Sequence, residues 1–157
     1  MPQQFVVFRA AGELYALPLE SVREVVNAAP RRGIPSPPAP WVVGLASIRG
    51  ELMPVVDLGV RMGFTEAAPA ESGVLLVVEA KRRANVKAER AAVAVERVDK
   101  LAEPEVLTPA PSYAGDAAQA IFERGDDLIM VLKPGALIPE GGTAAPRRRA
   151  APKSRPG

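Results

Sequence analysis

Residues 41–63 read WVVGLASIRGELMPVVDLGVRMG, and this stretch is the most informative in the chain. Two short apolar runs flank a tight turn at Arg49-Gly50-Glu51, and a glycine at the first central position of a two-residue loop favours a type II′ β-hairpin. Asp57 follows the second run, where its carboxylate can accept backbone N–H bonds at a helix start, and Gly63 is placed to end that helix. The stretch therefore predicts a strand, a hairpin turn, a second strand and one helical turn.

A weaker copy of the same pattern follows later in the chain. Residues 49–56, RGELMPVV, resemble residues 124–132, RGDDLIMVL, at an offset of 124 − 49 = 75. Residues 17–22, LPLESV, resemble residues 93–98, VAVERV, at an offset of 96 − 20 = 76. Two independent matches at nearly one spacing indicate a duplicated unit. The alternative is chance similarity, because β segments all draw on valine, isoleucine and leucine.

The composition narrows the class of protein. A chain of 157 residues, 48% of them hydrophobic, suffices for one domain or for two very small units that share a core. Cysteine and histidine are absent, which removes disulfides, thiolate metal ligands, a cysteine nucleophile and the commonest general base. The phosphate-loop, hydrolase-elbow, zinc and calcium motifs are also missing. We therefore expect no enzyme, no catalytic residues, no cofactor and no metal site.

Basic residues are concentrated in two segments. The chain has a net charge of +2, while the tail 141–157 holds five basic residues and no acidic one, so residues 1–140 sum to 2 − 5 = −3. Such a tail cannot bury enough apolar surface to offset its ordering entropy, and we expect it to be disordered. The segment 79–90, EAKRRANVKAER, has five basic and two acidic residues and is expected to be a solvated hairpin tip.

The chain shows no signal sequence and no apolar run of about 18 residues, so we expect a cytoplasmic protein without membrane insertion. Short strands, frequent turns and missing long helices predict an all-β fold of two small packed barrels with about five strands each. Residues 1–140 should form this domain, with subdomains at about 4–64 and 74–132 and a closing segment 133–140 that returns to the first. Trp41 should plug the preceding proline-rich loop onto the barrel, with ligand stacking as the alternative.

The order and spacing of several segments resemble the CheW-like coupling domain of bacterial chemosensory systems. The resemblance covers roughly residues 4–138. It rests on FVVF at 5–8, YALPL at 15–19, VREV at 22–25, PWVVGL at 40–45, the Arg49-Gly50 pair, PVVDL at 54–58, VAVERV at 93–98 and RGDDLI at 124–129.

This resemblance implies two SH3-like β-barrels and a non-enzymatic adaptor that couples chemoreceptors to a chemotaxis-type histidine kinase. The implied partners are the regulatory domain of that kinase and the cytoplasmic tip of the receptor. The residues implied to face the kinase are Val6, Leu19 and Val22. The residues implied to lie at or near the receptor site are Glu24, Gly44, Arg49 and Val98.

Two of these assignments have a structural alternative. Val22 could equally be a core residue. Glu24 and Arg49 are expected to meet across the first barrel, where the arginine fork can hold the carboxylate bidentately. That pair could orient a receptor-binding surface or act only as a structural clasp. The sequence departs from the family pattern at Lys133, where an aspartate usually caps the closing helix, and at Ser47, which usually is asparagine.

A second function is compatible with the basic segments. A nucleic-acid-binding protein built on small barrels would use the tail 141–157 and the loop 79–90. The low aromatic content of 4% offers few stacking platforms for bases. The adaptor interpretation, in contrast, expects no nucleic-acid partner.

Overall fold

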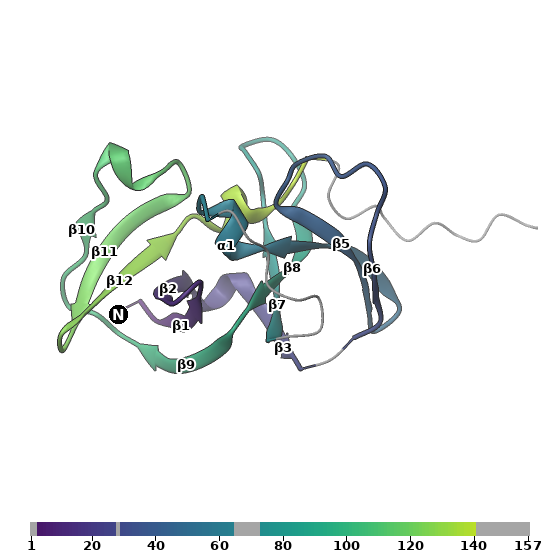
Figure 1. Ribbon diagram of the computed structural model, residues 1–157. Helices are drawn as coiled ribbons and strands as arrows, with labels where there is room; N and C mark the ends of the chain where they lie inside the picture. The colour runs from purple at the N-terminus through teal and green to yellow at the C-terminus, as the bar shows by residue number, and fades with distance from the viewer. Residues whose placement is uncertain (1–2, 28, 65–72, 141–157) are drawn as a thin grey trace, which may run out of the picture.

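Figure 1 shows the computed structural model, which describes residues 3–27, 29–64 and 73–140. The fold is almost entirely β, with two six-stranded sheets that correspond to the two expected barrels. No helix in these ranges is long and apolar enough to cross a membrane. The basic tail 141–157, which we expect to be disordered, lies outside the described residues.

The strands are divided between two sheets. The first barrel has the order β3-β7-β8-β6-β5-β4 and the second has the order β10-β11-β12-β2-β1-β9. The first consists of β3 (Val22–Val26), β4 (Arg31–Arg32), β5 (Val42–Ile48), β6 (Glu51–Asp57), β7 (Val74–Ala80) and β8 (Glu89–Val95). The second consists of β1 (Phe5–Ala10), β2 (Glu13–Pro18), β9 (Arg97–Ala102), β10 (Thr108–Pro109), β11 (Ala118–Arg124) and β12 (Asp127–Leu132). The short helices are η1 (Leu19–Ser21), α1 (Leu58–Arg61), η2 (Ser112–Ala114) and η3 (Pro134–Leu137). Each sheet exceeds the expected five strands because a two-residue strand, β4 or β10, pairs at one edge.

The predicted internal repeat is confirmed, and the two repeats exchange a hairpin. Strands β1 and β2 lie in the sheet of β9–β12, while β7 and β8 lie in the sheet of β3–β6. The exchanged hairpins are joined to their hosts by equivalent parallel pairs, β12 with β2 and β6 with β8. The expected subdomain bounds, 4–64 and 74–132, therefore do not follow the sheets. Local sequence signals identify each hairpin but do not determine which repeat it completes.

The exchange explains why the exchanged hairpins have unbroken apolar runs. Along β1, Phe5 and Val7 face the interior of the second barrel, while Val6 and Phe8 face a central cluster between the barrels. Along β7, alternate residues likewise face the first barrel and the central cluster. Successive side chains of a strand point to opposite faces, so a strand buried on both faces must be apolar throughout.

The turn at Arg49-Gly50 has a different geometry from the expected one. Ile48 pairs with Glu51, so Arg49 and Gly50 are the two loop residues, with φ values of 53° and 79°. Positive φ at both positions is the pattern of a type I′ turn rather than type II′. The register places the glycine second in the loop, and Arg49 accepts the strained first position.

The helix that ends each repeat differs in its cap. The Asp57 carboxylate accepts a hydrogen bond of 3.0 Å from the backbone N–H of Val60, which confirms the predicted cap of α1. At the equivalent position, Lys133 makes no side-chain cap, and the segment that follows is the 3-10 helix η3. Leu137 and Ile138 then bury their side chains in the central cluster. The closing segment thus packs at the junction of the barrels, against β7 of the first.

Arg61 connects three parts of this junction. Its guanidinium carbon lies 5.0 Å from the ring centroid of Trp41, and its Nε donates a 3.0 Å hydrogen bond to the carbonyl of Ala136. Its terminal nitrogens donate to the carboxylate of Asp116 in the second barrel at 3.2 and 3.4 Å. Trp41 is half-buried against the central cluster, so it covers the barrel junction as expected of a plug.

We expect Arg61→Met to lower the free energy of unfolding by about 2 kcal/mol, because it removes a cation–π contact and a hydrogen bond to a half-buried carbonyl. The matched control is Asp116→Asn, which should change stability by less than about 0.5 kcal/mol because its side chain is 83% exposed. Urea denaturation measures both. If both substitutions lowered the free energy of unfolding equally, only the surface ion pair between Arg61 and Asp116 would contribute to stability.

A titration gives a second measurement of the same contact. The hydrogen bond and charge of Arg61 lower the pKa of the Asp116 carboxyl below its ordinary value. Its contribution to stability is therefore complete above the unfolded-state pKa and lost as the pH falls through the lower folded-state pKa. In Arg61→Met, NMR titration should find the pKa of Asp116 shifted upward; an unchanged pKa would contradict this cause.

Candidate functional site

An edge strand of the first barrel holds the candidate site. Strand β3 pairs with β7 on one side only, and a β-bulge interrupts its register between Val22 and Glu24. The preceding η1 carries Leu19, whose exposed fraction is 36%. Val22 is half-buried against the central cluster, and Val25 is 46% exposed. An exposed edge with apolar side chains is a typical docking surface.

Glu24 and Arg49 form the predicted contact. The Nε–H of Arg49 is shared between the two carboxylate oxygens of Glu24, at 3.0 Å to Oε1 and 2.8 Å to Oε2. The expected geometry had two guanidinium N–H groups on the carboxylate, whereas only one is used. The terminal nitrogens of Arg49 make no hydrogen bond to another described residue. They are therefore available to an outside acceptor.

The carboxylate of Glu24 further favours the charged form of Arg49, which is protonated at neutral pH in any case. The hydrogen bond and the charge of Glu24 raise the pKa of Arg49 above its ordinary value. The Arg49 side chain is 82% exposed, while that of Glu24 is 26% exposed. The Glu24 carboxylate on β3 thus holds the Arg49 guanidinium in place at the tip of the β5–β6 hairpin.

The second barrel repeats this ion pair. Arg124 donates a 3.2 Å hydrogen bond to Asp99, and both residues lie at an offset of 75 from their counterparts, since 124 − 49 = 75 and 99 − 24 = 75. Asp99 lies on β9, the edge strand that is equivalent to β3 and that also carries a bulge. The backbone N–H of Lys100 and then Arg124 lower the pKa of Asp99. A clasp between hairpin tip and edge strand is therefore a common feature of both repeats.

The two clasps differ in the exposure of the arginine. The Arg124 side chain is 35% exposed, less than half of the value for Arg49. The registers account for this difference, because Arg49 is the first residue of its two-residue loop, whereas Arg124 pairs with Asp127 as the last residue of β11. The first-barrel pair consequently combines a structural contact with an outward-facing cation.

The structure corrects the expected role of Val6. This residue pairs with Leu17 and Leu101 in the sheet and is only 5% exposed, with its side chain in the central cluster. It cannot contact a partner in this conformation. The reason is the hairpin exchange, which buries both faces of β1.

Gly44 and Val98 have different surroundings. Gly44 is buried under β4, where an added Cβ would lie 2.6 Å from the carbonyl oxygen of Arg32. The absence of a side chain at Gly44 allows β4 and β5 to approach each other closely. Val98 is half-buried opposite Phe8 and packs on the central cluster, as Val22 does from the other barrel. These two valines therefore flank the junction of the barrels, while Gly44 stays beneath the surface.

A groove with a mixed polar and apolar lining in the second barrel was not expected from the sequence. Its volume is about 660 Å³, and its lining combines Pro104, Val106, Pro109, Pro111, Ile121, Phe122 and Leu128 with the polar Glu105, Thr108 and Glu123. Val106 and Leu128 are 71% and 64% exposed. The proline-rich run from Pro104 to Pro111 is the signal that could have indicated it, because fixed φ angles hold such a segment away from the sheet. Leu52, 60% exposed on β6, is a further exposed apolar residue without a predicted role.

Comparisons with known proteins agree with the arrangement just described. The family model described as CheW-like domain matches residues 4–141. The chain is 26% identical over 144 residues to a probable chemotaxis protein CheW of Rhizobium etli, with 88% of each chain covered. It is 28% identical over 137 residues to a chemotaxis protein CheW of Treponema pallidum, covering 82% of this chain and 78% of the other. The crystal structure of the scaffolding protein TtCheW from Thermoanaerobacter tengcongensis matches with a TM-score of 0.71 and 27% identity, over 85% of this chain and 90% of that one.

We expect Gly44→Ala to destabilise the protein by about 1–3 kcal/mol, because the methyl group would press against the backbone of β4. Gly33→Ala is the matched control, since nothing lies within 4 Å of its added Cβ. The control should stay within about 0.5 kcal/mol of the parent protein. Urea denaturation of the two variants tests this, and equal stabilities would show that β4 moves away at no cost.

Proposed function

We propose that this chain, which belongs to the CheW-like domain family, is a chemotaxis-type signalling adaptor that couples a chemoreceptor tip to the regulatory domain of a histidine kinase. The observation that carries the proposal is the combination on one edge of the first barrel of an apolar strip and a fixed, outward-facing guanidinium. This combination suits two different partners at neighbouring positions. We place the protein in the cytoplasm, where both partners would present these domains.

The apolar part of the edge is proposed to bind the kinase. Leu19 and Val25 expose side chains beside the half-buried Val22, and β3 has an unpaired backbone edge. A domain with a similar small-barrel fold could pack its own apolar edge here. Desolvation of a few such side chains supplies most of the affinity of ordinary protein interfaces.

The charged part is proposed to bind the receptor. The terminal nitrogens of Arg49 can donate to a carboxylate or a backbone carbonyl at the surface of a helical receptor tip. Glu24 would orient the guanidinium and reduce the entropy lost on binding. Val98 would border this site at the junction of the barrels, and Gly44 would act only through the packing of β4.

Leu19→Asp tests the kinase surface without disturbing the core. We expect binding to the isolated regulatory domain of the cognate kinase to weaken at least about tenfold, because a charge replaces a desolvated apolar contact. The melting temperature should stay within a few degrees of the parent value, since Leu19 is 36% exposed.

Val43→Asp is the matched control for this experiment. Val43 has nearly the same exposure, 38%, and lies near the start of β5, at the opposite end of that strand from Arg49. The Val43→Asp variant should bind the kinase domain as tightly as the parent protein does. Equal loss in both variants would indicate a nonspecific effect, and full binding by Leu19→Asp would place the kinase site elsewhere.

A double-mutant cycle on Glu24 and Arg49 tests the receptor surface. We expect Arg49→Ala to reduce affinity for a receptor-tip peptide about tenfold or more, with little change in the melting temperature for so exposed a pair. Glu24→Ala should have a smaller effect on affinity, and that effect should vanish in the Arg49→Ala background. Arg124→Ala, which breaks the equivalent clasp of the second barrel, serves as the control. Strong coupling in stability with unchanged affinity would identify the pair as a clasp only.

A further inference from the structure

The groove of the second barrel lies beside an open edge of the sheet. Strand β10 pairs with β11 over its two residues, of which Thr108 lies opposite Ile121. The same register would place Val106 opposite Glu123, but β10 begins only at Thr108 and this pair is not formed. The segment that precedes β10 therefore diverges from β11, and both line the groove.

The backbone of Glu123 is directed to this open edge. On the β10 side of β11, the carbonyl of Gln119 accepts a 3.0 Å hydrogen bond from the N–H of Ala110. Backbone groups of an antiparallel strand point alternately to its two neighbours, so Glu123, an even number of residues further along, points to the same side. No strand of the described ranges pairs with Glu123 there. Its N–H and C=O are therefore available to an added strand.

Exposed apolar side chains form part of the groove. Val106 and Leu128 are both exposed, and Leu128 lies on β12 directly opposite Glu123. The volume of about 660 Å³ is within the usual range of ligand-binding clefts. Large apolar side chains that stay exposed around a cleft mark a site of interaction.

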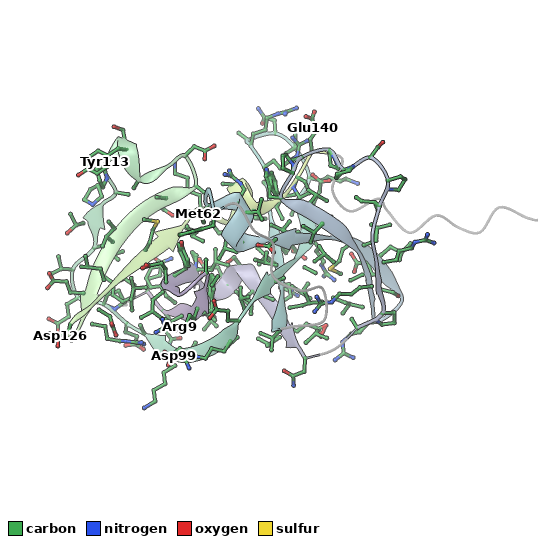
Figure 2. The ribbon with its side chains drawn as sticks, in the orientation of Figure 1. Arg9, Met62, Asp99, Tyr113, Asp126 and Glu140 are labelled. Carbon is green, nitrogen blue, oxygen red and sulfur yellow. The ribbon has the colours of Figure 1, made fainter. Side chains whose placement is uncertain are left out.

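Carboxylates surround the same groove. Glu105 and Glu123 belong to its lining, and Asp126 and Asp127 follow at the tip of the β11–β12 hairpin, where Figure 2 labels Asp126. All four are exposed and form no ion pair with another residue that the structure describes. Arg124 of the same hairpin is already paired with a carboxylate on β9. The groove therefore combines apolar side chains with negative charge that has no counterion in the described ranges.

We propose that this groove binds an extended peptide segment of another protein, in which apolar side chains neighbour lysine or arginine. The segment would add a short strand beside β11 and exchange backbone hydrogen bonds with Glu123, as in recognition by strand addition. Its apolar side chains would cover Val106 and Leu128. Its cations would meet the carboxylates of Glu105 and Glu123.

Charge and side-chain size select this occupant. The carboxylates repel a phosphate backbone or an acidic peptide and attract a basic one. Residues 141–157 of the chain itself are basic, but their apolar residues are only alanine and proline. Such side chains are small for a groove of this volume, and proline has no N–H to donate to the carbonyl of Glu123. A partner segment with larger apolar side chains fits both properties of the groove.

This proposal does not depend on the adaptor function. The groove belongs to the second barrel, whereas Leu19 and Arg49, which are proposed to contact the kinase and the receptor, belong to the first. Leu19→Asp should therefore bind a groove peptide as tightly as the parent protein does. Either proposal can fail without the other.

Fluorescence anisotropy with the full-length chain tests the binding. The probe is a fluorescein-labelled peptide of about eight residues, blocked at both ends, in which valine and lysine alternate so that one face of the strand is apolar. Two further peptides replace every lysine by glutamate or every valine by serine. At about 50 mM salt, we expect the valine–lysine probe to bind at least about tenfold more tightly than either.

Substitutions in the groove separate its three contributions. Leu128→Ser should weaken binding roughly fivefold or more, because it removes an apolar contact. Glu105→Gln combined with Glu123→Gln should weaken binding by a similar factor at low salt and bind like the parent protein at about 1 M salt, where charges are screened. A probe that is N-methylated at alternate residues, so that it cannot donate to the carbonyl of Glu123, should bind at least about tenfold more weakly.

Matched substitutions elsewhere serve as controls. Leu52 on β6 is 60% exposed, close to the 64% of Leu128, so Leu52→Ser removes a comparable side chain from the other barrel. Glu20→Gln combined with Glu140→Gln removes two exposed carboxylates outside the groove. Both controls should bind the probe as the parent protein does, and melting curves show whether each variant keeps its fold.

Several results would overturn the proposal. Equal binding of the lysine and glutamate peptides would remove the charge argument, and equal losses in Leu128→Ser and Leu52→Ser would place the contact elsewhere. Tighter probe binding after replacement of the five basic residues of the tail by alanine would make that tail the occupant. A dimer in sedimentation analysis that Leu128→Ser dissociates would make a second copy of the chain the occupant.

Discussion

The reciprocal exchange of hairpins between the two repeats is the constraint on which the rest of this structure depends. Each barrel is completed by two strands from the other repeat, so neither repeat can close its own sheet. The exchanged strands β1 and β7 separate the barrel interiors from the central cluster and supply side chains to both. The same two strands therefore contact the barrel interiors and the junction, where the edge strands β3 and β9 begin.

That junction fixes the relation between the two edges that carry the candidate contacts. Val22 and Val98 pack on the same central cluster from the two barrels, and Arg61 bridges the first barrel, the closing segment and the second. A partner that contacts the first edge therefore meets a surface whose position relative to the second barrel is set by buried packing. Preorganisation of this kind suits a coupling protein, because little ordering entropy is lost when a partner binds.

Local features of the fold could be predicted from the sequence, and long-range pairings could not. The hairpin around Gly50, the cap by Asp57 and the repeat itself follow from short-range patterns, and all three are present. The sheet that a hairpin joins depends on which of its apolar faces fits which barrel interior. The apolar runs of the β1–β2 and β7–β8 hairpins are chemically alike, so the sequence does not distinguish the two pairings. For the same reason the burial of Val6 was missed, because a single strand does not show that both of its faces are covered. The junction role of Arg61 was also missed, since it joins segments far apart in the chain through one long side chain.

The internal repeat also distinguishes contacts that both barrels share from features that occur in only one barrel. A contact present at the same offset in both halves, such as the arginine–carboxylate clasp, is explained by the closure of a small barrel around a bulged edge strand. A difference between the halves needs another explanation. The exposed guanidinium of Arg49 is such a difference, and so is the basic loop between β7 and β8, because the equivalent turn between β1 and β2 is the two-residue Ala11-Gly12. A hairpin needs no eight-residue basic loop to turn. These departures from the repeat are therefore the places where we propose that function rather than folding accounts for the sequence.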